Sequence, residues 1–224
     1  LDNTVIVFFN DHGQNAKGTL YQGGVHNPCL IWRKGGFACG QELGALLSNV
    51  DFAPTLLNLA GVETSASDFD GESFRNLLDG APAQADRALY FELGYTRAVR
   101  KGDWKYIELR YPDAVANMPA EERMRALEDW NADRRRKHLP IVTTDPERPF
   151  SHLTPIPGGG HAESESTGTR PGYFDPEQVY DLASDPGELL NLRYQDSGRE
   201  KVLELRNMLL NRTPTGSTPG AFSH

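Results

Sequence analysis

The sequence predicts an α/β layer followed by a small antiparallel sheet that a C-terminal helix covers. The layer is indicated by an apolar run at residues 5–9, which reads as a buried strand ending at polar residues and a glycine-rich loop. The sheet is indicated by residues 88–93, 96–100 and 104–109, in which apolar and polar side chains alternate. Apolar residues at helical spacing follow between residues 198 and 211. These patterns place the chain in the α/β class, with an added α+β part.

The α/β layer is predicted to occupy residues 1 to about 80. After the first strand and its loop, residues 28–33 form a second strand that is also expected to be buried. A helix follows from Asp51, whose carboxylate can cap it, and Pro54 is tolerated in its first turn. Gly61 is a natural terminator of this helix.

The antiparallel part is predicted to contain a tight turn at residues 101–103, which joins two of its strands. A strand near residues 178–182 could join the same sheet, and the helix at 198–211 would cover one of its faces. The strand residues expected to pack in the core are Tyr90, Phe91, Val99, Trp104, Tyr106 and Ile107. The helix residues expected to face the sheet are Val202, Leu205, Met208 and Leu209.

Residues from about 111 to 171 form a predicted insertion. It contains a helix that begins near Pro119 with acidic residues and ends in the basic run 134–138, which complements the helix macrodipole. This run is either a clamp for an anionic substrate or a solvated helix end, and the solvated end is favoured. In the long loop that follows, His152 and His161 could contact substrate, although exposed loop histidines are the favoured interpretation.

The predicted organisation is therefore residues 1–85 as the last part of the α/β domain, 86–212 as an α+β subdomain with its insertion, and 213–224 as a flexible tail. The chain has 224 residues, of which 38% are hydrophobic, so it can bury a core. Its net charge of −8 argues against a nucleic-acid partner, because phosphate binding needs a basic face. No apolar run approaches the ~20 residues that span a bilayer.

The two cysteines define no disulfide framework. Cys29 lies on a predicted buried strand, where a free thiol behaves as a small hydrophobic side chain, and Cys39 follows ten residues later. A disulfide between them stays open, and so does the cellular compartment.

Candidate chemistry gathers at the end of the first strand. Asp11 and His12 follow the strand directly, and Lys17 lies a few residues further along the loop. A carboxylate and an imidazole on adjacent residues can both reach a divalent cation, and a nearby lysine can hold an anionic group close to that cation. The pattern therefore indicates a combined metal and anion site.

The whole loop resembles the sulfatase family. In that family a strand ending in Asp-Asn-Gly or Asp-His-Gly is followed by Gly-Lys-Gly-Thr-like and Tyr-Glu-Gly-Gly-Val-Arg-like segments, and then by Val-Pro. The matching residues here are Asp11, His12, Lys17, Gly18, Thr19, Tyr21, Gly23, Gly24, Val25 and Pro28. The resemblance, which covers about residues 1–110 and 173–212, implies the C-terminal part of an alkaline-phosphatase-like sulfatase fold.

Three further segments resemble the same family. Residues 51–61 are similar to its Asp-x-x-Pro-Thr-Leu-Leu helix, and residues 70–74 to the Asp-Gly-x-Ser-Leu loop that follows. Residues 179–192 resemble its closing Leu-Tyr-Asp-Leu, Asp-Pro-Gly-Glu, Asn-Leu pattern. We interpret this last segment as a surface turn without chemistry, in which Glu188 and Asn191 lead toward the final helix.

The resemblance implies a sulfuric ester hydrolase in which a formylglycine hydrate attacks the sulfur and a divalent cation neutralises the sulfate oxygens. Asp11 and His12 would be metal ligands, and Lys17 would bind the sulfate. Calcium is the usual metal of the family and the first expectation. The histidine keeps Mn²⁺ and Zn²⁺ open, because these ions accept nitrogen ligands more readily.

The nucleophile motif of the family, Cys/Ser-x-Pro-Ser-Arg, does not occur in this sequence, and the upstream carboxylate ligands are missing too. We therefore expect the C-terminal part of a longer sulfatase that is inactive alone, with formylglycine only in the N-terminal part. Two alternatives stay open. One is a phosphonate or phosphate ester hydrolase of the same superfamily, and the other is a non-catalytic assembly or binding domain.

The expected partners follow from the same interpretation. The substrate of the intact enzyme would be a sulfate ester, and neither nucleic acid nor a membrane span is expected. A layer without its upstream strands exposes apolar groups, including those of residues 5–9. We therefore expect self-association, or pairing with the N-terminal part, through residues 5–9 or the helix at 51–60.

Overall fold

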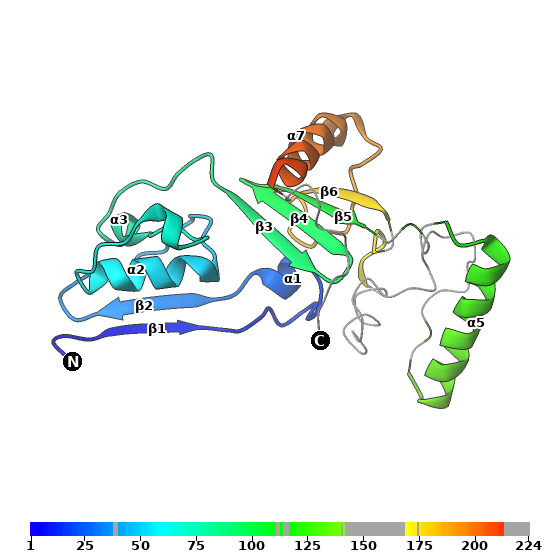
Figure 1. Ribbon diagram of the computed structural model, residues 1–224, viewed down its shortest axis with the longest axis horizontal. Coiled ribbons are helices and arrows are strands. Elements are labelled where there is room, and N and C mark those ends of the chain that lie inside the picture. Colours follow the sequence, from blue (N-terminus) through cyan, green and yellow to red (C-terminus); the bar gives the residue numbers. More distant parts are fainter. Residues whose placement is uncertain are drawn as a thin grey trace. The chain divides into compact units, whose positions relative to one another are not determined.

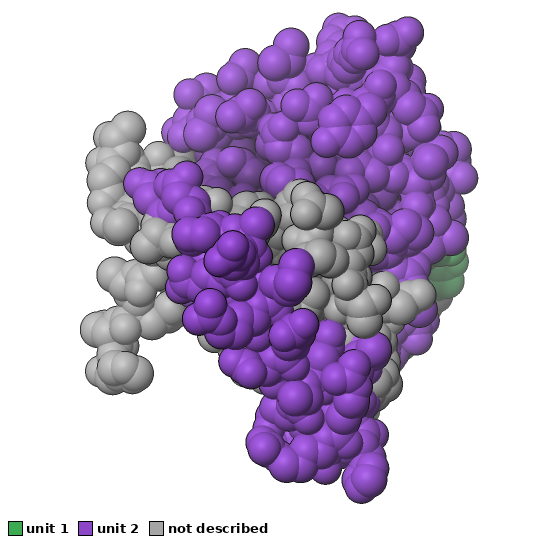
Figure 2. All heavy atoms as spheres, turned by 90° about the vertical axis from the view of Figure 1, so that its right-hand side faces the viewer, with its two compact units in different colours: residues 1–10, 28–89 green, residues 11–27, 90–224 purple. Residues whose placement is uncertain are grey.

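The computed structural model describes residues 1–37, 40–110, 113, 117–139, 141, 169–173 and 175–212. The chain forms two compact units, which Figure 2 colours separately. The first contains residues 1–10 and 28–89, and the second contains residues 11–27 and 90–224. The loop that carries Asp11, His12 and Lys17 thus belongs to the second unit, although the strands on either side of it belong to the first.

The first unit is built on a two-stranded antiparallel ribbon of β1 (Val5–Phe9) and β2 (Cys29–Arg33). A short 3₁₀ turn, η1 (Asn49–Asp51), leads into α2 (Phe52–Leu59), and η2 (Ala66–Asp68) and α3 (Arg75–Leu78) follow. Figure 1 shows α2 and α3 on one side of the ribbon. Phe52 of α2 packs between Phe9 and Phe74, with ring centroids 4.8 and 5.9 Å away.

The prediction that β1 and β2 are buried strands is wrong, because several of their side chains are exposed among the residues that the structure describes. Phe8 is 54% exposed and Leu30 is 68% exposed. Phe8 faces Leu30 across the ribbon and Ile6 faces Trp32, so these four exposed side chains share the face opposite to Phe9. An apolar run predicts a strand that something covers, but it does not say that the same chain supplies the cover. Cys29 is likewise a free, exposed cysteine rather than a buried one, and Cys39 lies outside the described residues.

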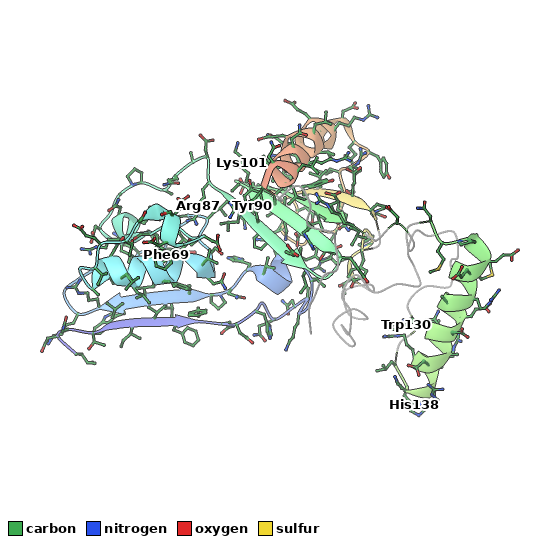
Figure 3. The ribbon with its side chains drawn as sticks, viewed as in Figure 1. Phe69, Arg87, Tyr90, Lys101, Trp130 and His138 are labelled. Carbon is green, nitrogen blue, oxygen red and sulfur yellow. The ribbon has the colours of Figure 1, made fainter. Side chains whose placement is uncertain are left out.

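Asp51 was predicted to cap the helix, and in the structure it also links several segments of this unit. It lies one turn inside the start, where Ser48 and Asp51 form a capping box around η1. The Asp51 carboxylate is fully buried and accepts hydrogen bonds from the Ser48 amide (2.7 Å) and the Glu72 amide (2.9 Å). It also pairs with the Arg87 guanidinium at 2.6 Å; Figure 3 labels Arg87. At the other end, α2 stops at Leu59 and the chain reverses at Gly61, whose φ of +79° suits glycine.

A four-stranded sheet, which belongs to the second unit apart from the first two residues of β3, has the strand order β3 (Ala88–Leu93), β4 (Thr96–Lys101), β5 (Trp104–Leu109), β6 (Glu177–Asp181). These bounds confirm the predicted strands to within a residue or two. The pairs β4–β5 and β5–β6 are antiparallel, and Val99 lies opposite Tyr106. Helix α7 (Asp196–Arg212) contacts β4, β5 and β6, as Figure 1 shows.

Of the four α7 side chains predicted to face the sheet, Val202, Leu205 and Leu209 are buried and Met208 is half-buried. Polar contacts at the rim hold the same packing. Lys101 at the end of β4 lies 3.3 Å from Glu204 of α7, and Arg212 lies over the Tyr90 ring at 4.6 Å. Figure 3 labels Lys101 and Tyr90 near this helix.

Within the insertion the structure describes α5 (Ala120–Arg136), which confirms the predicted helix. Asp133 pairs with Arg136 and Lys137, so the end of the basic run is partly neutralised within the helix itself. Arg134 departs from the interpretation as a solvated end because it is buried. His138, labelled in Figure 3, is exposed. His152, His161 and the predicted tail at 213–224 lie outside the described residues.

Among the helices that the structure describes, none combines the length and the apolar character needed to cross a membrane.

Candidate functional site

The candidate metal ligands Asp11 and His12 lie just beyond the end of β1. Their nearest polar atoms, Asp11 Oδ2 and His12 Nε2, are 3.6 Å apart. The Asp11 side chain is 85% exposed and that of His12 is 29% exposed, so one cation could reach both from solvent. The two side chains, which are adjacent in the chain, thus lie within reach of one another, and their role as metal ligands stays a prediction.

The His12 ring is oriented by a backbone contact. Its Nδ1 lies 2.7 Å from the Gly13 carbonyl oxygen. Because a carbonyl can only accept, Nδ1 carries the proton and donates it, which leaves Nε2 with a free lone pair in the neutral ring. Histidines that bind metals commonly donate their other ring N–H to a carbonyl or carboxylate in this way. The free nitrogen is the one that faces Asp11.

The two ligands do not form a complete metal shell. Over the described ranges, no group of three or more His, Cys, Asp or Glu side chains could hold a metal ion. Calcium takes about 6 to 8 oxygen ligands. Lys17 is exposed on the same loop, as a residue that binds an anion from solvent would be.

The loop holds its shape through close backbone packing. The Gly13 amide donates to the Gly24 carbonyl at 2.8 Å, and the Asn15 amide donates to the Gly23 carbonyl at 3.2 Å. A Cβ atom on Gly13 would lie 2.0 Å from the Gly23 oxygen, and one on Gly24 would lie 2.5 Å from the Ala16 oxygen. The glycine-rich spacing is therefore needed for two chain segments to touch, independently of any ligand.

Apolar side chains of the same loop anchor it in the core of the second unit. Ala16, Leu20 and Tyr21 are buried, and they belong to one cluster with Ile107 and Tyr180. The Tyr21 hydroxyl donates to Gln178 Oε1 at 2.8 Å. Burial raises the pKa of Tyr21 well above its ordinary value, so this phenol stays protonated. The loop that carries the exposed candidate ligands is thus anchored by buried side chains.

A buried ion pair lies next to this anchored part of the loop. Lys105 Nζ on β5 is 2.8 Å from Glu188 Oε1, and both side chains are fully buried. Glu188 Oε2 accepts a 2.5 Å hydrogen bond from the Gln22 amide, at the start of α1 (Gln22–Val25). Burial lowers the pKa of the Lys105 ammonium to about 8, although the Glu188 charge acts in the opposite direction.

This pair corrects the interpretation of residues 179–192 as a surface turn only, because Glu188 points into the core. The sequence held one sign of this pair, at Lys105 on β5. Lys105 alternates with Ile107 and Leu109, so it occupies an inward position of β5. A lysine at such a position requires a buried carboxylate, but the alternation does not say which acidic residue supplies it.

Comparisons of sequence find similarity to sulfatases. Residues 10–111 match a family profile described as N-sulphoglucosamine sulphohydrolase, C-terminal. The chain is 27% identical over 220 residues to the ulvan-active sulfatase of Formosa agariphila, covering 93% of this chain and 33% of that protein. The chain thus spans a third of the length of this relative.

Solved structures share the fold. A protein solved in complex with its substrate D-glucosamine-2-N,6-O-disulfate superposes with a TM-score of 0.58 and 20% identity, covering 94% of this chain and 34% of that one. The phosphonate monoester hydrolase of Agrobacterium radiobacter superposes with a TM-score of 0.54 and 17% identity, covering 94% of this chain and 35% of that one. At these identities the two likenesses concern the fold alone.

Proposed function

We infer that this chain is the C-terminal portion of a sulfatase, and we propose that it contributes part of a site for sulfate ester hydrolysis. The observation that carries this proposal is the Asp11–His12 pair, in which Nε2 of a histidine oriented by Gly13 faces a carboxylate at 3.6 Å. In the proposed site these two residues bind the metal, and Lys17 binds the sulfate group.

The residues present fit one side of a divalent cation site. Asp11 offers carboxylate oxygen and His12 offers nitrogen. The described residues add no third such side chain to this pair, so in the proposed site the remaining ligands come from another part of the intact protein. A divalent cation bound there would neutralise charge on the sulfate oxygens. We propose calcium, the usual family metal, and the nitrogen donor leaves Mn²⁺ and Zn²⁺ as the alternatives.

The nucleophile is not supplied by this sequence, which contains no Cys/Ser-x-Pro-Ser-Arg motif. In the proposed enzyme formylglycine comes from the N-terminal portion of the family fold. The exposed ribbon face formed by Ile6, Phe8, Leu30 and Trp32 supports this proposal, because contiguous apolar patches commonly mark interaction surfaces. We propose that this face pairs with the N-terminal portion or, in its absence, with a second copy of this chain.

The competing activity is phosphonate or phosphate ester hydrolysis. The fold does not choose between the two chemistries, since the phosphonate monoester hydrolase superposes about as well as the protein solved with a sulfated substrate. Sequence similarity favours sulfate, because the matched family profile and the ulvan-active relative both describe sulfatases.

The decisive experiment extends the coding sequence upstream of Leu1 and assays the extended protein. We expect a Cys/Ser-x-Pro-Ser-Arg motif upstream and hydrolysis of an aryl sulfate that Asp11→Ala and Lys17→Ala each abolish. Faster hydrolysis of an aryl phosphonate than of the sulfate would favour the competing activity. A natural start codon immediately before Leu1, with no turnover of either ester, would instead favour a non-catalytic binding domain.

A further inference from the structure

The buried Lys105–Glu188 pair connects the closing turn of the chain to the loop that carries the candidate site. Glu188 binds the lysine with one carboxylate oxygen and the Gln22 amide with the other, at 2.8 and 2.5 Å. Lys105 Nζ also lies 3.4 Å from Gln22 Oε1. Both charged groups thus converge on the residue that begins α1.

A short series of hydrogen bonds leads from Gln22 to the candidate ligands. The carbonyls of the next two residues, Gly23 and Gly24, accept from Asn15 and Gly13. Gly13 adjoins His12, and its own carbonyl orients the His12 ring. The anchoring carboxylate is therefore separated from the ligand pair only by α1 and one layer of backbone hydrogen bonds.

Glu188 is itself held by a hydrogen-bonded turn. Asp185 Oδ2 accepts from the Leu189 and Leu190 amides, both at 2.8 Å, and the Glu188 amide donates to the Asp185 carbonyl at 3.1 Å. Glu188 has a φ of +55°, in the left-handed region that residues other than glycine seldom adopt. The turn thus holds Glu188 in an unusual backbone conformation, in which its carboxylate lies inside the core.

Stability alone accounts poorly for this arrangement. Replacing a buried ion pair by apolar side chains of similar volume is often neutral or stabilising, because desolvation cancels the attraction. Burial lowers the pKa of the Lys105 ammonium, which is the direction expected of a desolvation cost, although the Glu188 charge opposes it. An apolar pair would fill the same space, but it could not accept the Gln22 amide proton.

We propose that Lys105 and Glu188 are positioning residues that hold the loop bearing Asp11, His12 and Lys17 in its binding conformation. The proposal rests on the proposed function for the meaning of that conformation. The proposal also says that the pair orders this loop more than it stabilises the sheet. This part can be tested separately.

The test measures amide hydrogen exchange by NMR in the full chain. The variant combines Lys105→Met with Glu188→Leu, which removes both charges at similar volume. We expect the Gln22, Gly13 and Gly24 amides to exchange roughly 10 to 100 times faster, because the charge-assisted bond is lost, while β4 and β5 keep their wild-type rates. Equal acceleration of loop and sheet, or an unchanged loop, would overturn the proposal.

Two further variants keep the result interpretable. Lys105→Met with Glu188→Gln keeps an oxygen acceptor for the Gln22 amide and should restore most of the loop protection, even if the apolar variant folds poorly. Glu177→Gln is the matched control, since Glu177 pairs with Arg193 in the same unit, and no hydrogen bond joins that pair to the loop among the described contacts. Loop exchange in the control should equal the wild type, and accelerated loop exchange there would count against a specific role for Lys105 and Glu188.

A titration with sodium sulfate separates this inference from the proposed function. Wild type and Glu177→Gln should show shifts at the Lys17 and Gly18 amides, which the apolar variant loses. If wild type shows no such response, sulfate binding by this chain is refuted, whereas the exchange rates still decide whether the pair positions the loop.

Discussion

Replacing Asp51 by alanine should destabilise the first unit by about 3–5 kcal/mol, the range for breaking a buried ion pair by removing one partner. Three donors lose their acceptor: the Ser48 amide, the Glu72 amide and the Arg87 guanidinium, which is only 15% exposed. An unsatisfied donor costs about 1–3 kcal/mol when it is buried. All three of these hydrogen bonds are only part-buried, so partial rehydration of the donors brings the total into the same range. Asp51→Asn should cost less, because its amide oxygen can still accept.

The assay is urea unfolding followed through the NMR amide signals of α2, which report the first unit directly. Asp79→Ala is the matched control, because Asp79 forms a partly exposed i,i+4 pair with Arg75. That change should cost less than about 1 kcal/mol. If Asp51→Ala cost no more than Asp79→Ala, the carboxylate would not be the centre of this unit.

Four further predictions concern turnover, calcium binding, self-association and stability at low pH. Residues 1–224 should hydrolyse no aryl sulfate, since the nucleophile motif is absent; turnover that survives repurification and disappears in Asp11→Ala would refute this. Calorimetry should detect weak Ca²⁺ binding or none, because two ligands fall short of about 6 to 8; micromolar affinity would contradict it. Sedimentation should show self-association that Phe8→Lys with Leu30→Glu reduces, because these exposed side chains face each other; a monomer at high concentration would exclude the ribbon as an interface. Desolvation opposes the shift at Glu177, but hydrogen bonds from Tyr106 and Arg193 and the arginine charges lower its pKa below 4.5. Its contribution to stability is therefore present above pH 4.5 and lost as pH falls through the lowered value, so Glu177→Gln should flatten the acid limb of a urea-stability profile, and an unchanged limb would exclude this group.

Local patterns in the sequence determined much of the fold. Alternation predicted β4 and β5 and the turn at Gly102, because side-chain direction in a strand repeats every two residues. Helical spacing predicted which residues of α7 face the sheet, since it depends only on the helix period. The Asp11–His12 pair could also be identified from a local pattern, because the two candidate ligands are adjacent in the chain.

Only the tertiary structure decided which groups meet over long separations. Lys105 and Glu188 are 83 residues apart, and no local period indicates that a carboxylate after an Asp-Pro-Gly turn enters the core. Arg87 reaches Asp51 across 36 residues in the same way. The exposed face of β1 and β2 was likewise decided by the path of the chain. Hydrophobicity expresses a tendency of a side chain to leave water, and whether this chain or another molecule covers that side chain depends on which segments lie against it.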